Sequence, residues 1–193
     1  MRAVMLEVPE YLLEERRRMG VDTFDEMWDG ELHMVPPPSD SHQRVESEII
    51  AAFLPLAKAR RMIASVETGL FRPGQTERDY RVPDLVVSRP ENRTRHGVEG
   101  RAELVVELRS PGDETYHKLG FYAEMEVQEL VVIDPDTCSI ELFVLRDGDL
   151  VKMSPSSEDS FSVTCLELTL SNPERGALLL AWPGGSTEIT AAW

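Results

Sequence analysis

Two short apolar runs in the sequence are typical of buried β-strands, and each contains one carboxylate. Residues 82–87 read Val-Pro-Asp-Leu-Val-Val, which places Asp84 among strand-forming residues, and residues 104–108 read Leu-Val-Val-Glu-Leu, which does the same for Glu107. A carboxylate in a buried strand is costly unless it is paired or binds a metal. If the two strands are neighbours, Asp84 and Glu107 converge on one point. The sequence therefore predicts a sheet that holds an acidic site.

Apolar periodicity and turn residues predict alternating helices and strands elsewhere in the chain. A helix is expected to begin at the capping residues 39–42 and to continue to about Arg61, although Pro55 should kink or split it. The other expected elements are helices at 10–18 and 114–126, a strand pair or hairpin over 24–35, strands at 63–71, 82–87, 104–108, 130–133, 139–145 and 150–153, and a polar loop over 88–101. This order predicts a mixed α/β domain of the α+β type, with a central mixed sheet flanked by helices.

The chain has 193 residues, a length that suits a single domain. Residues 10–150 contain the clear helix and strand patterns and are expected to form the core, with 151–193 as a C-terminal extension. Within that extension only 161–165 has a possible strand pattern. The final dozen residues are expected to be loosely held.

Charge and composition restrict the classes of function. The chain has 20 basic and 35 acidic residues, a formal net charge of −15, which argues against a protein that coats nucleic acid non-specifically. No stretch approaches the roughly 18 apolar residues that would span a bilayer. Cys138 and Cys165 are too few for a disulfide scaffold and are expected to be buried, reduced side chains. We expect a soluble cytoplasmic protein with no membrane partner.

Converging carboxylates suit a hard divalent cation such as Mg²⁺ or Mn²⁺. A cation between Asp84 and Glu107 would make a bound water a better nucleophile and neutralise charge on a phosphate. Lys118 is expected near the start of the helix that follows the Glu107 strand, a position that favours phosphate. In the structural alternatives, Asp84 caps a turn, Glu107 pairs with Arg109, and Lys118 is an ordinary surface lysine.

The order and spacing of several motifs resemble a known family. The motifs are Trp28-Asp29-Gly30-Glu31-Leu32, Pro38-Ser39-Asp40-Ser41-His42, Pro83-Asp84, Glu107-Leu108-Arg109-Ser110-Pro111, Lys118-Leu119 with Tyr122, and the run from Val127 to Asp134. Together they are similar to the Uma2 (Uma-two) family, which belongs to the restriction-endonuclease-like, PD-(D/E)XK nuclease superfamily. The resemblance covers about residues 10–150.

The resemblance implies a divalent-metal-dependent phosphodiesterase fold with defined site residues. Asp84 and Glu107 would hold Mg²⁺ or Mn²⁺, with the Leu108 carbonyl as a further oxygen ligand. Glu31 is similar to an acidic position that can join the metal shell, although it can also be a solvated hairpin residue. His42 would orient water or substrate, unless it serves only in helix capping or packing.

The lysine position departs from the superfamily pattern. The lysine is normally two residues after the acidic strand residue, where this chain has Arg109. Lys118, on the following helix, is the candidate replacement. Arg109 can stabilise charge on a phosphate but cannot act as a base. Tyr122, one helical turn beyond Lys118, can stack or hydrogen-bond, but is more often a core residue.

These features favour a metal-dependent endonuclease that hydrolyses phosphodiester bonds, with DNA as the expected substrate. The alternative is a nuclease-fold binding or regulatory module with weak or no catalysis, which the net charge of −15 supports because an acidic surface repels nucleic acid. A structural subunit of an oligomer is a third interpretation. The family resemblance suggests a homodimer.

Overall fold

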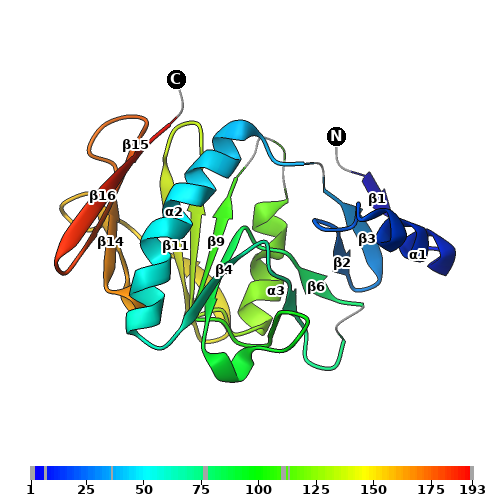
Figure 1. Cartoon of the computed structure of the whole chain (residues 1–193). Helices are drawn as coiled ribbons and strands as arrows, with labels where there is room; N and C mark the ends of the chain where they lie inside the picture. Colours follow the sequence, from blue (N-terminus) through cyan, green and yellow to red (C-terminus); the bar gives the residue numbers. More distant parts are fainter. Residues whose placement is uncertain are drawn as a thin grey trace.

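The computed structural model describes residues 3–6, 8–35, 37–75, 78–109, 112 and 114–191. Ser110 and Pro111 of the family-like motif lie outside the described residues. Three β-sheets follow one another across the molecule, with helix α2 (Asp40–Ala59) in front of the central sheet and helix α3 (Leu119–Glu124) behind it (Figure 1). The predicted α+β fold, a central mixed sheet flanked by helices, is confirmed.

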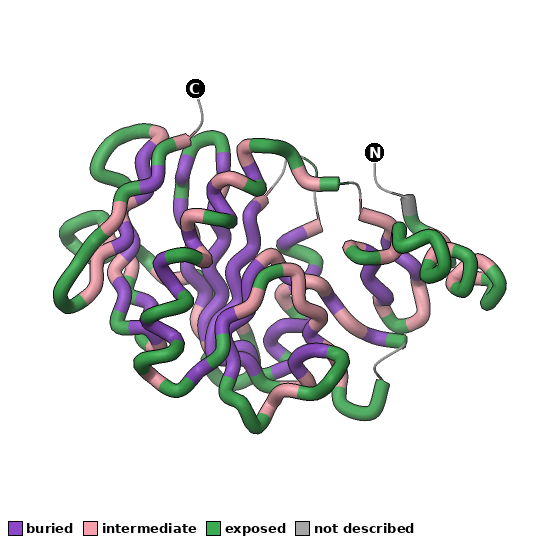
Figure 2. Tube along the Cα trace, viewed as in Figure 1, coloured by how far each residue is buried: buried purple, intermediate pink, exposed green. Residues whose placement is uncertain are grey.

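The central sheet has the strand order β12-β11-β10-β9-β7-β4. Strands β9 and β10 are parallel, and every other neighbouring pair is antiparallel. The three middle strands are buried along their whole length, as the purple segments in Figure 2 show. The strands of this sheet are β4 (Ile63–Val66), β7 (Leu85–Ser88), β9 (Leu104–Leu108), β10 (Glu129–Ile133), β11 (Ile140–Arg146) and β12 (Asp149–Lys152).

Alternation along the buried strands divides the core between the two faces of this sheet. One set of strand residues, including Val87 and Val106, packs with Ile49 and Phe53 of α2. The other set, including Val105, packs with Phe121 of α3. Because successive strand residues point to opposite faces, a continuous apolar run serves both layers at once.

Helix α2 begins where the sequence predicts, at the N-cap Ser39, whose hydroxyl accepts the backbone N–H of His42 at 3.3 Å. The helix continues without a break through Pro55, so the expected split does not occur. Proline removes one backbone donor, but the buried residues on both sides of it keep the two halves packed on the sheet. The helix therefore holds His42, in its first turn, over the end of the central sheet.

A second sheet has the order β1-β3-β2-β6-β5-β8 and carries the predicted hairpin. Asp29 and Gly30 form its turn, and both have positive φ. Helix α1 (Glu10–Met19) lies beside this sheet and has no buried residue. The strands are β1 (Ala3–Met5), β2 (Glu26–Trp28), β3 (Glu31–Met34), β5 (Leu70–Phe71), β6 (Tyr80–Arg81) and β8 (Val98–Glu99).

The expected single strand over 63–71 is wrong, because the chain changes sheets within it. Strand β4 ends at Val66, Glu67 takes a positive φ of 46°, and β5 begins at Leu70 in the second sheet. The expected loop over 88–101 also contains regular structure: the short helix η1 (Pro90–Asn92) and strand β8. The change of sheet and strand β8 both arise from strand pairing within the second sheet, which apolar periodicity does not report.

The C-terminal residues form a third sheet, in the order β13-β14-β15-β16, instead of a loosely held end. Six buried side chains of this sheet, together with Leu166 of η3, belong to the same core cluster as α2, and Ile189 is completely buried. Short strands give a weak sequence signal, and their formation here depends on packing against α2. The elements are β13 (Ser160–Val163), η3 (Thr164–Leu166), β14 (Leu168–Ser171), β15 (Ala177–Trp182) and β16 (Gly185–Thr190).

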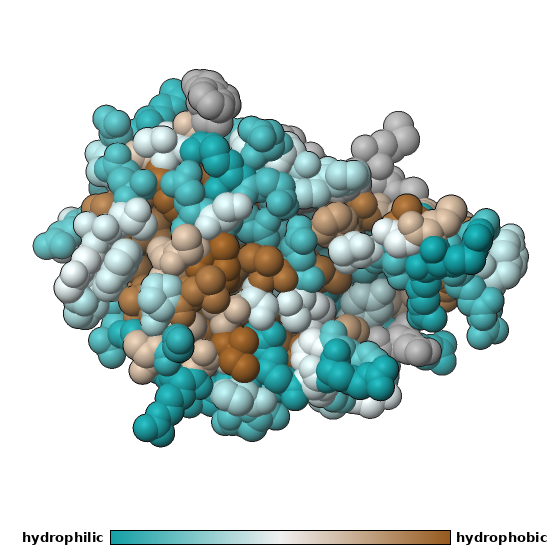
Figure 3. All heavy atoms as spheres, viewed as in Figure 1, coloured by the Kyte–Doolittle hydropathy of each residue, from teal (hydrophilic) through white to brown (hydrophobic). Residues whose placement is uncertain are grey.

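Truncating a side chain of this sheet is expected to destabilise the whole protein. Leu180 is fully buried on β15, so Leu180→Ala should lower the free energy of unfolding by about 2–4 kcal/mol, as measured by urea denaturation. Leu54 is the matched control, because it is 49% exposed on α2, where apolar side chains reach the surface (Figure 3). Equal effects of Leu180→Ala and Leu54→Ala would contradict the integration of the third sheet into the core.

Two further sequence expectations concern the membrane and the cysteines. No helix in the described part of the chain has the length and apolar character needed to cross a membrane. Cys138 and Cys165 are both free; Cys138 is buried and Cys165 is half-buried.

Candidate functional site

Asp84 and Glu107 meet at one end of the central sheet. Leu85 of β7 is paired with Val106 of β9, so the antiparallel register brings the residue before Leu85 opposite the residue after Val106. The Oδ2 atom of Asp84 accepts the backbone N–H of Leu108 at 2.5 Å. Because the N–H and C=O of one strand residue point to the same side, we expect the Leu108 carbonyl also to face Asp84. The convergence inferred from the strand pattern is present.

Lys118 is buried against these carboxylates. It ends the short helix η2 (Thr115–Lys118), and its Nζ lies 3.1 Å from Oε1 of Glu107 and 2.7 Å from Oε1 of Glu26. Tyr122 donates its hydroxyl proton to the same Glu107 oxygen. Lys118 is only 5% exposed, so its interpretation as a surface lysine is wrong.

The alternative pairing of Glu107 with Arg109 does not account for these contacts. The Arg109 guanidinium lies 3.2 Å from Oδ2 of Asp134, and its side chain is 41% exposed. Glu107 instead contacts Lys118 and Tyr122. The cationic partner of Glu107 is therefore Lys118, which comes from η2.

The buried environment shifts the pKa values of both Glu107 and Lys118. Burial raises the pKa of Glu107, and repulsion from Asp84 and Glu26 raises it further, whereas Lys118 and the Tyr122 hydroxyl oppose the shift. Burial alone would lower the pKa of Lys118, but attraction to Glu107 and Glu26 outweighs it and keeps the ammonium protonated. Lys118 is therefore a fixed cation at neutral pH.

His42 and Glu46 approach Asp84 from helix α2. The Nε2 atom of His42 lies 3.1 Å from Oδ1 of Asp84, which holds the carboxylate from the side opposite Leu108. Among the described residues, His42 Nδ1 and Glu46 Oε1 are buried polar atoms with no hydrogen-bond partner. Burial, and then repulsion from Asp84 and Glu67, raise the pKa of Glu46 to about 7. This side of the site thus carries two buried polar atoms without a hydrogen-bond partner among the described residues.

Replacing Glu46 is expected to stabilise the metal-free protein at alkaline pH. Its folded pKa of about 7 exceeds its ordinary value of 4.5, so ionisation reduces stability as the pH rises through this interval. Glu46→Gln should add about 1–2 kcal/mol at pH 8, a rise in melting temperature of a few degrees, and almost nothing at pH 5. Glu48→Gln on the same helix is the control, because Glu48 is an exposed partner of Arg44. A rise of equal size at both pH values would contradict the assignment.

The acidic hairpin residue that contacts the cluster is Glu26. Its Oε1 accepts from Lys118 and from the Val82 backbone N–H at 3.0 Å. Glu31 is half-buried at the turn end of the same hairpin, opposite Trp28. Composition alone does not distinguish Glu26 from Glu31 as a site residue. Strand alternation is the available sequence signal, because it places Glu26 and Trp28 on the same face of β2.

The donor set fits a cation held mainly by water and substrate. Within the described residues, no group of three or more His, Cys, Asp or Glu side chains forms a finished metal shell. Asp84, Glu107 and the Leu108 carbonyl supply two carboxylates and one carbonyl, which matches Mg²⁺, an ion that keeps several waters and uses one or two protein carboxylates. The mutual repulsion that raises the pKa of Glu107 is what such a cation would relieve.

Comparisons with known proteins place the chain in a family. The model of Uma2, described as "Putative restriction endonuclease", matches residues 6–173. A crystal structure of "a putative nuclease belonging to DUF820" from Anabaena variabilis superposes with a TM-score of 0.55 and 18% identity, over 74% of this chain and 88% of the other. At this identity the likeness shows the shared fold alone. No curated protein matches the chain.

Proposed function

Because the chain belongs to the Uma2 family, which is described as "Putative restriction endonuclease", we propose that it is a divalent-metal-dependent endonuclease that hydrolyses phosphodiester bonds of DNA. One observation carries the proposal: a lysine buried between carboxylates beside Asp84, at the end of the central sheet. Such a group of charges is expensive to bury, and a catalytic role explains why it is kept.

Asp84, Glu107 and the Leu108 carbonyl are the proposed ligands of Mg²⁺ or Mn²⁺. The cation would supply Lewis acidity and a more acidic bound water. His42 fixes one oxygen of Asp84, and the Leu108 N–H fixes the other, so the carboxylate is oriented before a cation arrives. This preorganisation favours ligand binding because little rearrangement remains to be made.

Lys118 is proposed to stabilise negative charge on the phosphate. It remains protonated at neutral pH because Glu107 and Glu26 raise its pKa, so it donates hydrogen bonds and does not act as a general base. Arg109, half-exposed at the same end of β9, is proposed to contact a phosphate from the solvent side. In the hairpin we propose Glu26 as the acidic residue that holds Lys118, whereas the family resemblance suggests Glu31 as a residue that can join the metal shell. The proposed assembly is a homodimer, which light scattering would test.

A binding module without catalysis is the second candidate, because the chain carries a net charge of −15. A plasmid cleavage assay separates the two. The wild-type protein should cut DNA with Mg²⁺ or Mn²⁺ but not with EDTA, and Asp84→Asn should remove the activity. Asp147→Asn, in the exposed β11–β12 turn where positive φ suits asparagine, should cleave like the wild type. Absence of cleavage with either ion, or full activity of Asp84→Asn, would refute the proposal.

A further inference from the structure

The Glu26 carboxylate is tied to an aromatic side chain of its own strand. The indole Nε1–H of Trp28 donates to Oε2 of Glu26 at 2.8 Å, while Oε1 of Glu26 holds Lys118 at 2.7 Å. The carboxylate therefore connects Trp28 on one side to Lys118 on the other. Where the lysine lies depends on where Glu26 is held, because the Lys118 ammonium is 3.1 Å from Glu107 and closer to Glu26.

The Trp28 ring is held between two flat groups. The His33 ring stacks on it at 4.1 Å with an interplanar angle of 11°, and the Arg81 guanidinium lies 4.3 Å from its centre. Stacking and cation–π contacts both restrict how the indole can tilt. The direction of its N–H is consequently set by the neighbours of the ring.

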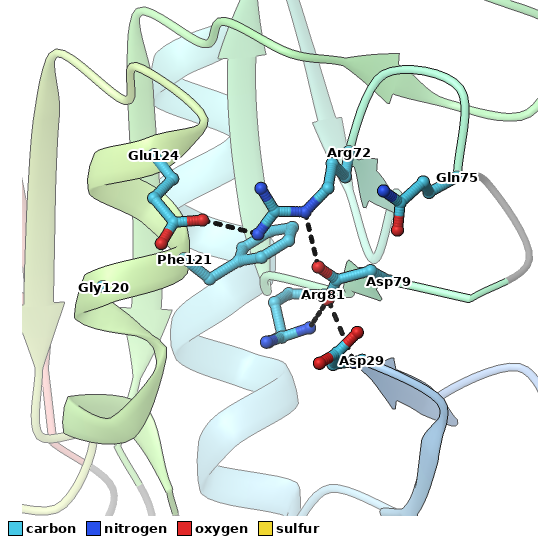
Figure 4. Close-up of a pocket in the computed structure, with 8 residues that line it drawn as sticks. All are labelled: Asp29, Arg72, Gln75, Asp79, Arg81, Gly120, Phe121 and Glu124. Carbon is cyan, nitrogen blue, oxygen red and sulfur yellow. Dashed lines mark hydrogen bonds and ion pairs between the residues drawn. The ribbon is translucent and has the colours of Figure 1, made fainter.

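Arg81 completes the clamp and is anchored independently of the site. It lies 4.1 Å over the Phe121 ring and donates to Oδ1 of Asp79 and to the Met27 carbonyl, each at 2.9 Å. Figure 4 shows the Arg81 and Phe121 side chains together on the wall of a pocket, with Asp79 joined to both Arg81 and Arg72. The stack therefore continues from β3 through β2 and β6 to helix α3, one turn after Lys118.

We propose that Trp28 is a positioning residue of the site: held between His33 and Arg81, its indole N–H fixes the Glu26 carboxylate that sets Lys118 against Glu107. The role in turnover rests on the proposed nuclease function, whereas the link between Trp28 and Glu26 does not. Ordinary core packing would need only the ring. The proposal needs the N–H, and this difference separates the two explanations.

The first experiment tests the link without any activity measurement. In ¹⁵N-labelled protein the indole N–H signal of Trp28 is identified as the one that Trp28→Phe removes. Glu26→Gln should shift this signal upfield, because a neutral amide is a weaker acceptor than a carboxylate. The Trp182 signal, from the C-terminal sheet, should not move. An unchanged Trp28 signal in Glu26→Gln would overturn the proposal, whether or not the protein cleaves DNA.

The second experiment tests the consequence for turnover. Trp28→Phe keeps a ring in the stack but removes the donor, so kcat should fall about tenfold while KM stays nearly constant. Loss of this donor also raises the pKa of Glu26, so the acid limb of the kcat profile should move to higher pH. In a Glu26→Gln background, Trp28→Phe should cause no further loss.

The controls separate this inference from the proposed function. Trp182→Phe should leave both kcat and the pH profile at wild-type values. If the wild type cleaves DNA and Trp28→Phe matches it in kcat and pH profile, the positioning role is refuted and the nuclease assignment stands. A tenfold loss that persists in the Glu26→Gln background would also refute it, because the effect would then come from packing.

Discussion

Glu107→Gln is expected to reduce metal-dependent DNA cleavage by about 10³-fold or more. Glutamine has the shape of glutamate and can still accept from Tyr122 and Lys118, so the buried cluster should keep its packing. The neutral amide, however, removes one of the two proposed carboxylate ligands of the cation. Initial rates of supercoiled plasmid nicking over a range of Mg²⁺ concentrations provide the measurement.

The response of Glu107→Gln to excess metal is a second test of the same variant. If Glu107 acts through the cation, part of the lost rate should return as the Mn²⁺ concentration rises, because a weaker site fills at higher concentration. Circular dichroism of the variant should match the wild type. Wild-type cleavage rates in correctly folded Glu107→Gln would show that Glu107 serves the fold alone.

Lys118→Met is expected to cause the largest loss of stability of any single change at the site. Lys118 is the cation between the buried Glu26 and Glu107 carboxylates, and removing one partner of a buried ion pair costs about 3–5 kcal/mol. Urea denaturation at pH 8 measures the effect. The matched control is Lys152→Met, because Lys152 forms an exposed pair with Glu141 at 3.0 Å and should cost at most about 1 kcal/mol.

The pH dependence of this loss has a definite sign. Glu26 and Glu107 raise the pKa of Lys118, so its stabilising charge is fully present at every pH below the ordinary lysine value of about 10.4. In Lys118→Met the two carboxylates have no ammonium between them, and they become neutral by taking up protons as the pH falls. The destabilisation should therefore be large at pH 8 and smaller at pH 5. A loss that does not depend on pH would indicate a packing defect instead.

The centre of the site is readable from the sequence because it depends on local rules. Carboxylates within apolar strands are costly, so Asp84 and Glu107 stand out, and the helix after the second strand brings Lys118 to the same end of the sheet. Tyr122 follows Lys118 by four residues and therefore shares its helix face. These placements need only strand alternation, helix periodicity and the pairing of the two strands.

The periphery of the site depends on contacts between distant elements and was not predictable in the same way. Glu26 joins the cluster because β2 pairs with β6, whose Arg81 packs on Phe121 of α3, whereas no contact joins Glu31 to Lys118 in the described part of the chain. Glu46 lies one helical turn from His42, but its raised pKa requires Asp84 and Glu67 to be brought near. Contacts between distant elements also explain why the strand break at Glu67 and the third sheet were not predicted.

Calorimetric titration of Mn²⁺ is the most direct test of the central claim that Asp84 and Glu107 share a divalent cation. The wild-type protein should bind one ion per chain, Glu107→Gln should bind at least about tenfold more weakly, and Asp147→Asn should bind like the wild type. Absence of binding to the wild type, both alone and with a DNA duplex, would contradict the claim. Equal affinity in the wild type and in Glu107→Gln would contradict it as well.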